Sequence, residues 1–121
     1  MPSTRRLGER AEALAAVHLE TQGYRILDRN FLARRGEIDL VAEEGDVLCL
    51  VEVRSRESAD FGDPLETISR EKRARLVRAA RQLLAERGWL ERAVRFDVVG
   101  IVYEPELRIT VVKNAFDATG A

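Results

Sequence analysis

The sequence predicts an α/β fold in which two helices flank a mixed β-sheet, with the elements in the order α-β-β-β-α-β-β. Two long segments carry apolar residues at helical spacing, and each is followed by a glycine. Three strand-like segments lie between these helices, and two more follow the second helix. The 121 residues contain no internal repeat and no obvious linker, so we expect one domain over residues 1–121.

The first helix is expected over residues 4–22. Leu7, Ala11 and Leu14 recur at helical spacing and form one apolar stripe. Gly23 follows, and glycine readily adopts the left-handed conformation that ends many helices.

Three strands are expected next, over residues 24–27, 37–42 and 47–54. The last of these begins with apolar residues on both faces, which indicates a central strand covered on both sides. Residues 43–46 are polar and contain a glycine, as hairpin loops commonly do.

The pairing of these strands decides which side chains share a face. In residues 37–42, three apolar side chains are expected together on one face: Ile38, Leu40 and Ala42. A four-residue loop over 43–46 places Asp39 opposite Leu50. The same register places Glu37 opposite Glu52. Four charged side chains are then expected on one side of the sheet: Glu37, Asp39, Glu52 and Arg54.

The second helix is expected from Ser69, a good N-cap, to Arg87, because Gly88 can end it. Two further strands are expected over residues 94–102 and 107–112. This completes a mixed sheet flanked by helices.

Three carboxylates on one face of a central strand pair should repel one another unless a cation lies between them. Oxygen ligands without cysteine or a second histidine favour a hard ion, Mg²⁺ or Mn²⁺, over zinc. The alternative is an ion-pair network in which Arg54 and Arg35 neutralise the acids. Spacing alone leaves both alternatives open.

Four motifs together resemble the YraN family (uncharacterised protein family 0102): Gly8-Glu9, Gly36-Glu37-Ile38-Asp39-Leu40, Val51-Glu52-Val53-Arg54 and Arg95-Phe96-Asp97-Val98-Val99. That family is similar to the restriction-endonuclease-like fold, and especially to archaeal Holliday-junction resolvases. The resemblance covers nearly the whole chain. It implies a restriction-endonuclease-like mixed sheet with a nuclease site of the PD-(D/E)-x-K type.

The resemblance also implies roles for particular residues. Asp39 and Glu52 match the two acids of the motif and are expected to be metal ligands, with the Val53 carbonyl as a further candidate. Glu9 matches an acid that such resolvases bring to the site from a helix. The alternative for Glu9 is a solvated carboxylate near a helix N-terminus.

One position departs from the pattern, since Arg54 stands where the motif has lysine. Arginine can stabilise the charge that develops on the phosphate, but it does not give up its proton. Lys72, early in the second helix, is a candidate for the missing lysine because helical spacing puts it at the border of the apolar stripe. The alternative is an ordinary surface lysine.

The second helix carries an arginine face opposite its leucines, formed by four residues: Arg70, Arg75, Arg78 and Arg81. Such a face can follow a phosphate backbone, although a solvated helix face is also common. We therefore expect a metal-dependent endonuclease acting on duplex or branched DNA. The rivals are a non-catalytic nucleic-acid-binding module and a protein-interaction domain that uses the surface near Trp89.

No signal-peptide pattern is present, and the apolar run at residues 47–51 is too short to span a bilayer. We expect a soluble, cytoplasmic protein without membrane contact. The resemblance implies a homodimer, because junction enzymes act as dimers.

Overall fold

A computed structural model describes residues 4–65 and 68–117. The elements are α1 (Thr4–Thr21), β1 (Arg25–Ala33), β2 (Gly36–Glu44), β3 (Val47–Ser58), the short 3₁₀ helix η1 (Ala59–Phe61), α2 (Arg70–Arg87), β4 (Val94–Glu104) and β5 (Arg108–Phe116). The predicted fold class, a mixed sheet flanked by helices in the order α-β-β-β-α-β-β, is confirmed. In the described part of the chain, no helix is long and apolar enough to cross a membrane.

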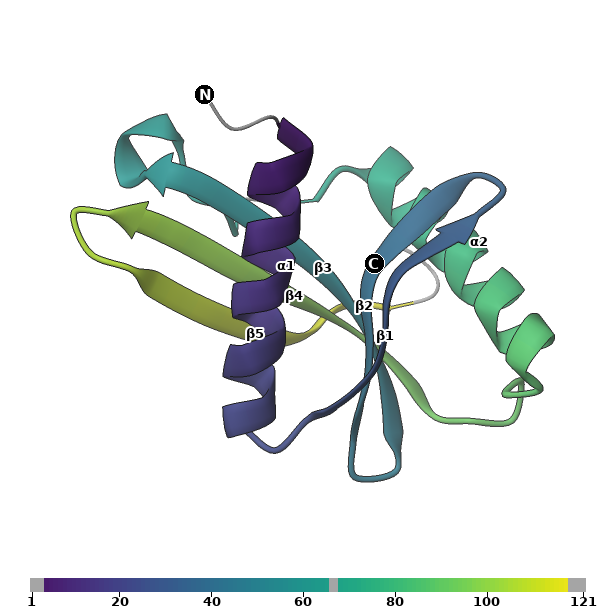
Figure 1. Ribbon diagram of the computed structural model, residues 1–121. Coiled ribbons are helices and arrows are strands. Elements are labelled where there is room, and N and C mark those ends of the chain that lie inside the picture. The colour runs from purple at the N-terminus through teal and green to yellow at the C-terminus, as the bar shows by residue number, and fades with distance from the viewer. Residues whose placement is uncertain (1–3, 66–67, 118–121) are drawn as a thin grey trace.

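The five strands form one sheet in the order β1-β2-β3-β4-β5. β3 and β4 are parallel, and the other three neighbouring pairs are antiparallel. A parallel pair needs a crossover connection, and α2 lies within the segment that joins β3 to β4. The helices lie on opposite sides of the sheet (Figure 1).

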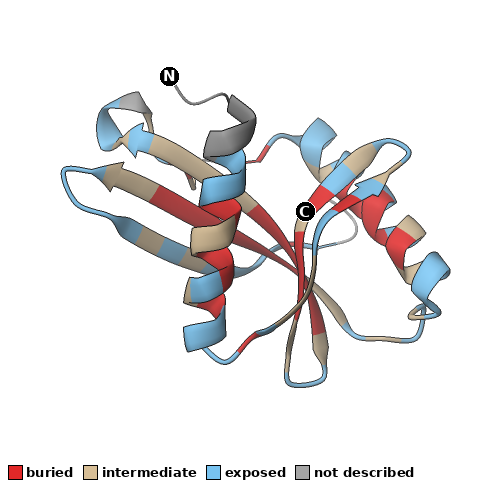
Figure 2. Cartoon of the chain, viewed as in Figure 1, coloured by how far each residue is buried: buried red, intermediate tan, exposed pale blue. Residues whose placement is uncertain are grey.

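The central position predicted for β3 is confirmed, since residues on both of its faces are buried (Figure 2). On one face, Cys49 and Val51 pack into a core cluster that contains Ala15 and Leu19 of α1. On the other face, Leu50 packs into a cluster formed with α2. Two cores therefore share one sheet.

Local signals predicted α2 closely. The Ser69 hydroxyl accepts a hydrogen bond from the Lys72 N–H at 3.1 Å, as an N-cap does. Gly88 ends the helix in the left-handed conformation, with a φ of 69°. β1, by contrast, extends well beyond the predicted residues 24–27, because polar residues continue the strand into the hairpin with β2.

The predicted loop over residues 43–46 is wrong. Glu43 and Glu44 belong to β2, and Gly45-Asp46 alone form the turn. A two-residue turn moves the register by two positions, so Glu44 pairs with Val47. Because the shift is an even number, the residues that pair between β2 and β3, 40–44 and 47–51, keep their predicted faces.

The predicted face shared by Ile38 and Leu40 is also wrong. Ile38 packs in the cluster with α2, whereas Leu40 packs in the cluster with α1. The alternation therefore breaks at Asp39, the residue between them.

A candidate metal and nucleic-acid site

The β2–β3 pair opens into a fork beside Asp39. The pairing ends at Leu40 and Val51, although β2 continues with β1 and β3 continues with β4 (Figure 1). At the fork, the Val53 N–H donates a hydrogen bond to Asp39 Oδ2 at 2.8 Å. A side-chain carboxylate thus takes the place of a strand partner for the β3 backbone.

Three carboxylates from two elements converge at this fork. Candidate ligand oxygens of Glu12, Glu37 and Asp39 all lie within 4.8 Å of one another. Glu12 comes from α1 and is 9% exposed, whereas the other two belong to β2. Asp39 therefore lies where α1 meets the open end of the β2–β3 pair.

Two cavities adjoin Asp39. The cavity towards α1 is lined by Gly8, Glu9, Glu12, Asn30, Leu32, Glu37 and Asp39. The cavity towards α2 is lined by Gly36, Glu37, Asp39, Glu52, Lys72, Arg75 and Leu76. Glu37 and Asp39 belong to both, so the two cavities meet at one acidic cluster. The second cavity brings Asp39 and Glu52, which were predicted to converge, together with Lys72, which was predicted separately.

The pKa of Asp39 is raised to about 8. Burial is the largest cause, and the charge of Glu52 is the next. The hydrogen bond from the Val53 N–H opposes this increase, while Glu12 and Glu37 add to it. Asp39 is thus surrounded by other acids as well as partly removed from solvent, and both conditions disfavour its charged form.

The pKa of Glu12 is also raised, mainly by burial. A hydrogen bond with the Asn30 side chain opposes the rise, and the charges of Glu37 and Glu9 add to it. Asn30 has a φ of 54°, a conformation that asparagine tolerates better than most residues. Asn30 lines the cavity towards α1, so this left-handed position in β1 lies beside the acidic cluster.

Lys72 reaches the second acid of the motif. Its Nζ lies 2.8 Å from Glu52 Oε1. The Glu52 side chain is 7% exposed, whereas that of Lys72 is 49% exposed. The ion pair therefore links a buried carboxylate to a side chain that solvent reaches. The first turn of α2 therefore places a lysine beside Glu52.

Arg54 and Glu9 occupy different positions. Arg54 is half-buried on β3, pairs with Gly100 of β4 and is absent from the described linings of both cavities. Glu9 is exposed on α1 and lines the cavity that also contains Glu12. Of these two α1 acids, Glu12 is the one that lies in the close carboxylate group.

Glu12 was not predicted from the sequence, although a signal exists. It precedes Ala16 by four residues and Leu19 by seven, so it lies within the apolar stripe of α1. A carboxylate inside such a stripe must find a polar environment in the folded protein. Its neighbours, however, come from the β1–β2 hairpin, which the helical pattern does not describe.

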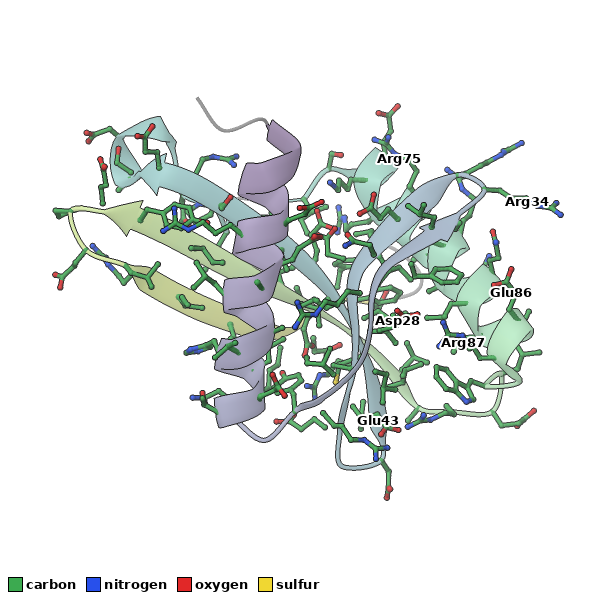
Figure 3. The ribbon with its side chains drawn as sticks, viewed as in Figure 1. Asp28, Arg34, Glu43, Arg75, Glu86 and Arg87 are labelled. Carbon is green, nitrogen blue, oxygen red and sulfur yellow. The ribbon has the colours of Figure 1, made fainter. Side chains whose placement is uncertain are left out.

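The predicted arginine face of α2 is exposed in all four positions, Arg70, Arg75, Arg78 and Arg81. Three of these line one shallow groove with Glu71 and Ala74: Arg70, Arg75 and Arg78. Arg75, which Figure 3 labels on α2, also lines the cavity with Asp39 and Glu52. The arginine face therefore adjoins the acidic cluster.

Asp97, the acid of the fourth motif, has a separate structural environment. It is 1% exposed and accepts hydrogen bonds from the Tyr24 hydroxyl, the Arg95 guanidinium and the Asn114 N–H. These contacts join β4 and β5 to the start of β1.

The surface near Trp89 was considered for protein interaction. The Trp89 side chain packs against the core cluster on the α2 side of the sheet, so its ring is partly covered.

Comparisons with known proteins agree with the resemblance seen in the motifs. The model of uncharacterised protein family UPF0102 matches residues 11–101. A UPF0102 protein of Anaeromyxobacter sp. is 46% identical over 93% of this chain and 86% of its own length. One from Ectopseudomonas mendocina is 43% identical over 98% of this chain and all of its own length.

The fold also resembles that of a solved structure. Hjc, a Holliday junction resolvase from Archaeoglobus fulgidus, is similar with a TM-score of 0.47 and 17% sequence identity. The match covers 84% of this chain and 74% of that protein. With the family model matching most of the chain and relatives aligned almost end to end, the protein belongs to uncharacterised protein family UPF0102.

Proposed function

We propose that this protein is a metal-dependent endonuclease that hydrolyses phosphodiester bonds in structured or branched DNA. The observation that carries the proposal is the meeting of Asp39, Glu52 and Lys72 in one cavity, which Arg75 also lines. Acids that can hold a cation, a lysine that can act on water and an arginine that can bind phosphate are the groups that this reaction requires.

The acidic cluster fits a hard divalent cation, Mg²⁺ or Mn²⁺. Its candidate ligands are carboxylate oxygens from Glu12, Glu37 and Asp39, with Glu52 lining the adjoining cavity. The raised pKa of Asp39 supports this assignment, because a bound cation would offset both the burial and the repulsion from Glu52 that raise it. When bound, the ion would polarise the phosphate and lower the pKa of a water molecule.

Lys72 supplies the function of the lysine that the motif lacks. Its ion pair with Glu52 holds the ammonium group beside the acids. From there it positions the attacking water or transfers a proton, and Arg54 cannot make the proton transfer because a guanidinium stays protonated. Arg54 contributes positive charge from β3.

On this proposal, the arginine face of α2 binds the DNA backbone through Arg70, Arg75, Arg78 and Arg81. Their side chains are exposed along one helix face, and Arg75 reaches the cavity that holds the acids. A strand lying along α2 would therefore bring a phosphate towards Asp39 and Glu52. Such contacts do not depend on base sequence.

The test is a panel of end-labelled linear, flapped and four-way DNAs incubated with Mg²⁺ or Mn²⁺. The wild type is expected to cut at least one branched DNA, and EDTA or Asp39→Asn is expected to abolish cutting. Asp28→Asn is a matched control, because Asp28 pairs with Arg87 on the surface, and it should cut normally.

The presence of Arg54 favours a second candidate function, a DNA-binding module that has the nuclease fold but does not hydrolyse DNA. On that alternative the wild type binds branched DNA but cuts none of the panel with either ion. Cutting that persists in Asp39→Asn would contradict both candidates, since the acids would then be unrelated to the activity.

A further inference from the structure

The tip of the β1–β2 hairpin combines an exposed leucine with two arginines. Leu32 is 72% exposed, the largest fraction among the exposed large hydrophobic residues described. Arg34 and Arg35 form the turn that follows and are both exposed. Figure 3 shows the Arg34 side chain pointing away from the body of the protein.

The tip is held firmly against α2. Phe31 and Ala33, which flank Leu32, pack against the core cluster on that side of the sheet. The Arg34 N–H donates a hydrogen bond to the Gln82 side chain at 3.0 Å. Gly36 approaches α2 so closely that a Cβ there would lie 3.1 Å from the Arg75 carbonyl oxygen. Leu32 therefore projects outward from an anchored support.

Leu32 also lies at the acidic site. It lines the cavity that contains Glu12 and Asp39, and it pairs across the hairpin with Glu37. A DNA strand whose phosphate reaches the acids would pass beside this leucine. The arginines of the turn lie next to it, where they can hold the flanking phosphates.

Taking DNA as the substrate from the proposed function, we propose that residues 32–35 select DNA whose base stacking is interrupted, with Leu32 entering the interruption. Opening a stacked step costs a few kcal/mol, whereas a branch point already has broken stacking. An apolar wedge thus gains contact with base faces at a branch without paying the opening cost. The same wedge gains little on continuous duplex.

The test compares Leu32→Ser with Leu90→Ser, an equally simple change at a leucine that is 67% exposed beyond the end of α2. The probes are a four-way junction and a linear duplex of equal length, each with 2-aminopurine at its centre. Affinity and 2-aminopurine fluorescence are measured with Ca²⁺ in place of Mg²⁺, in samples checked to contain no product.

The wild type and Leu90→Ser are expected to prefer the junction and to raise its 2-aminopurine fluorescence. Leu32→Ser is expected to lose about tenfold of that preference, on the scale of one buried leucine, together with the fluorescence increase. Its affinity for the linear duplex should stay within about twofold, because the phosphate contacts remain. Arg34→Ala should weaken binding to both DNAs.

The outcomes separate this inference from the proposed function. If Leu32→Ser keeps the junction preference and the fluorescence increase, the role of the hairpin is wrong, whether or not the protein cuts. If Leu32→Ser loses both and the wild type still cuts nothing, the hairpin inference stands and the nuclease proposal fails. If the wild type binds neither DNA, both are wrong.

Discussion

At the residue scale, the proposed chemistry depends on whether Lys72 takes the role of the lysine that the motif has at the position of Arg54. Arg54 follows Glu52 on β3, but Lys72 from α2 makes the ion pair with Glu52 at 2.8 Å. A lysine from another element can perform the same task when the fold brings its ammonium group to the same acid. The proposal therefore rests on the position of Lys72 in space and not on its position in the motif.

Lys72→Ala should lower the cleavage rate by at least about 100-fold, the usual scale of acid–base assistance. Arg54→Lys should preserve or raise the rate. Single-turnover cleavage of a branched DNA measures both. Lys113→Ala is the matched control, because the chain has two lysines and Lys113 pairs with Glu44 away from the acidic cluster.

The opposite pattern would assign the work to Arg54. Normal cutting by Lys72→Ala, together with an inactive Arg54→Ala, would mean that charge alone supports the reaction. Lys72 would then serve only to neutralise Glu52.

At the scale of single elements, α2 has one side for the core and one for solvent. Its buried residues are Leu76, Val77, Ala79, Ala80 and Leu83. The arginine face lies on the exposed side. One of its members, Arg75, also lines the cavity that contains Asp39 and Glu52. On the proposed function, one helix would therefore serve the core, the phosphate backbone and, through Lys72, the site itself.

Reversing charge on this face, with Arg75→Glu and Arg78→Glu together, should weaken binding to every DNA alike. The salt dependence of binding should also become shallower, because fewer counterions are released. Fluorescence anisotropy over a salt series measures both effects. The control is Arg108→Glu, at an exposed position on β5. It should change the DNA affinity at a given salt concentration, and the slope of the salt dependence, much less than the α2 variant does. An unchanged affinity and slope in the α2 variant would assign its arginines to solvent alone.

Across the whole molecule, the sequence predicted best what is locally encoded. Ser69 and Gly88 mark the ends of α2 because caps act within one turn. The convergence of Asp39 and Glu52 was also predicted from the strand pairing, and both line one cavity although the predicted β2–β3 register was wrong by two residues.

What the sequence did not predict depends on distant contacts. β1 continues through polar residues because β2 pairs with it, and Glu12 joins the site because α1 packs across the fork. The break in alternation at Asp39 arises where β2 leaves β3. Neither helical nor strand periodicity carries that information.

The Asp97 network should make stability depend on pH. Burial alone would raise the pKa of Asp97, but hydrogen bonds from Arg95, Asn114 and Tyr24 hold it below its ordinary value. The folded protein therefore binds this proton less readily than the unfolded chain. The stabilisation is complete above the unfolded pKa and is lost as the pH falls below about 4.

Asp97→Asn should lower the free energy of unfolding by about 3 kcal/mol near neutral pH, the scale of a broken buried ion pair. Urea unfolding should show this difference shrinking as the pH falls below about 4. Asp28→Asn, which breaks a half-exposed pair with Arg87, should cost less than about 1 kcal/mol. A constant difference at all pH values would contradict the role given to Asp97.

The central claim is that the acids at the fork bind a divalent cation, and calorimetric titration with Mn²⁺ tests it most directly. The wild type should bind Mn²⁺ at millimolar concentration or below, and Glu12→Gln, Asp39→Asn and Glu52→Gln should each weaken binding sharply with circular dichroism unchanged. If the wild type binds no Mn²⁺ with or without branched DNA, or if Asp39→Asn binds it as the wild type does, the claim is wrong.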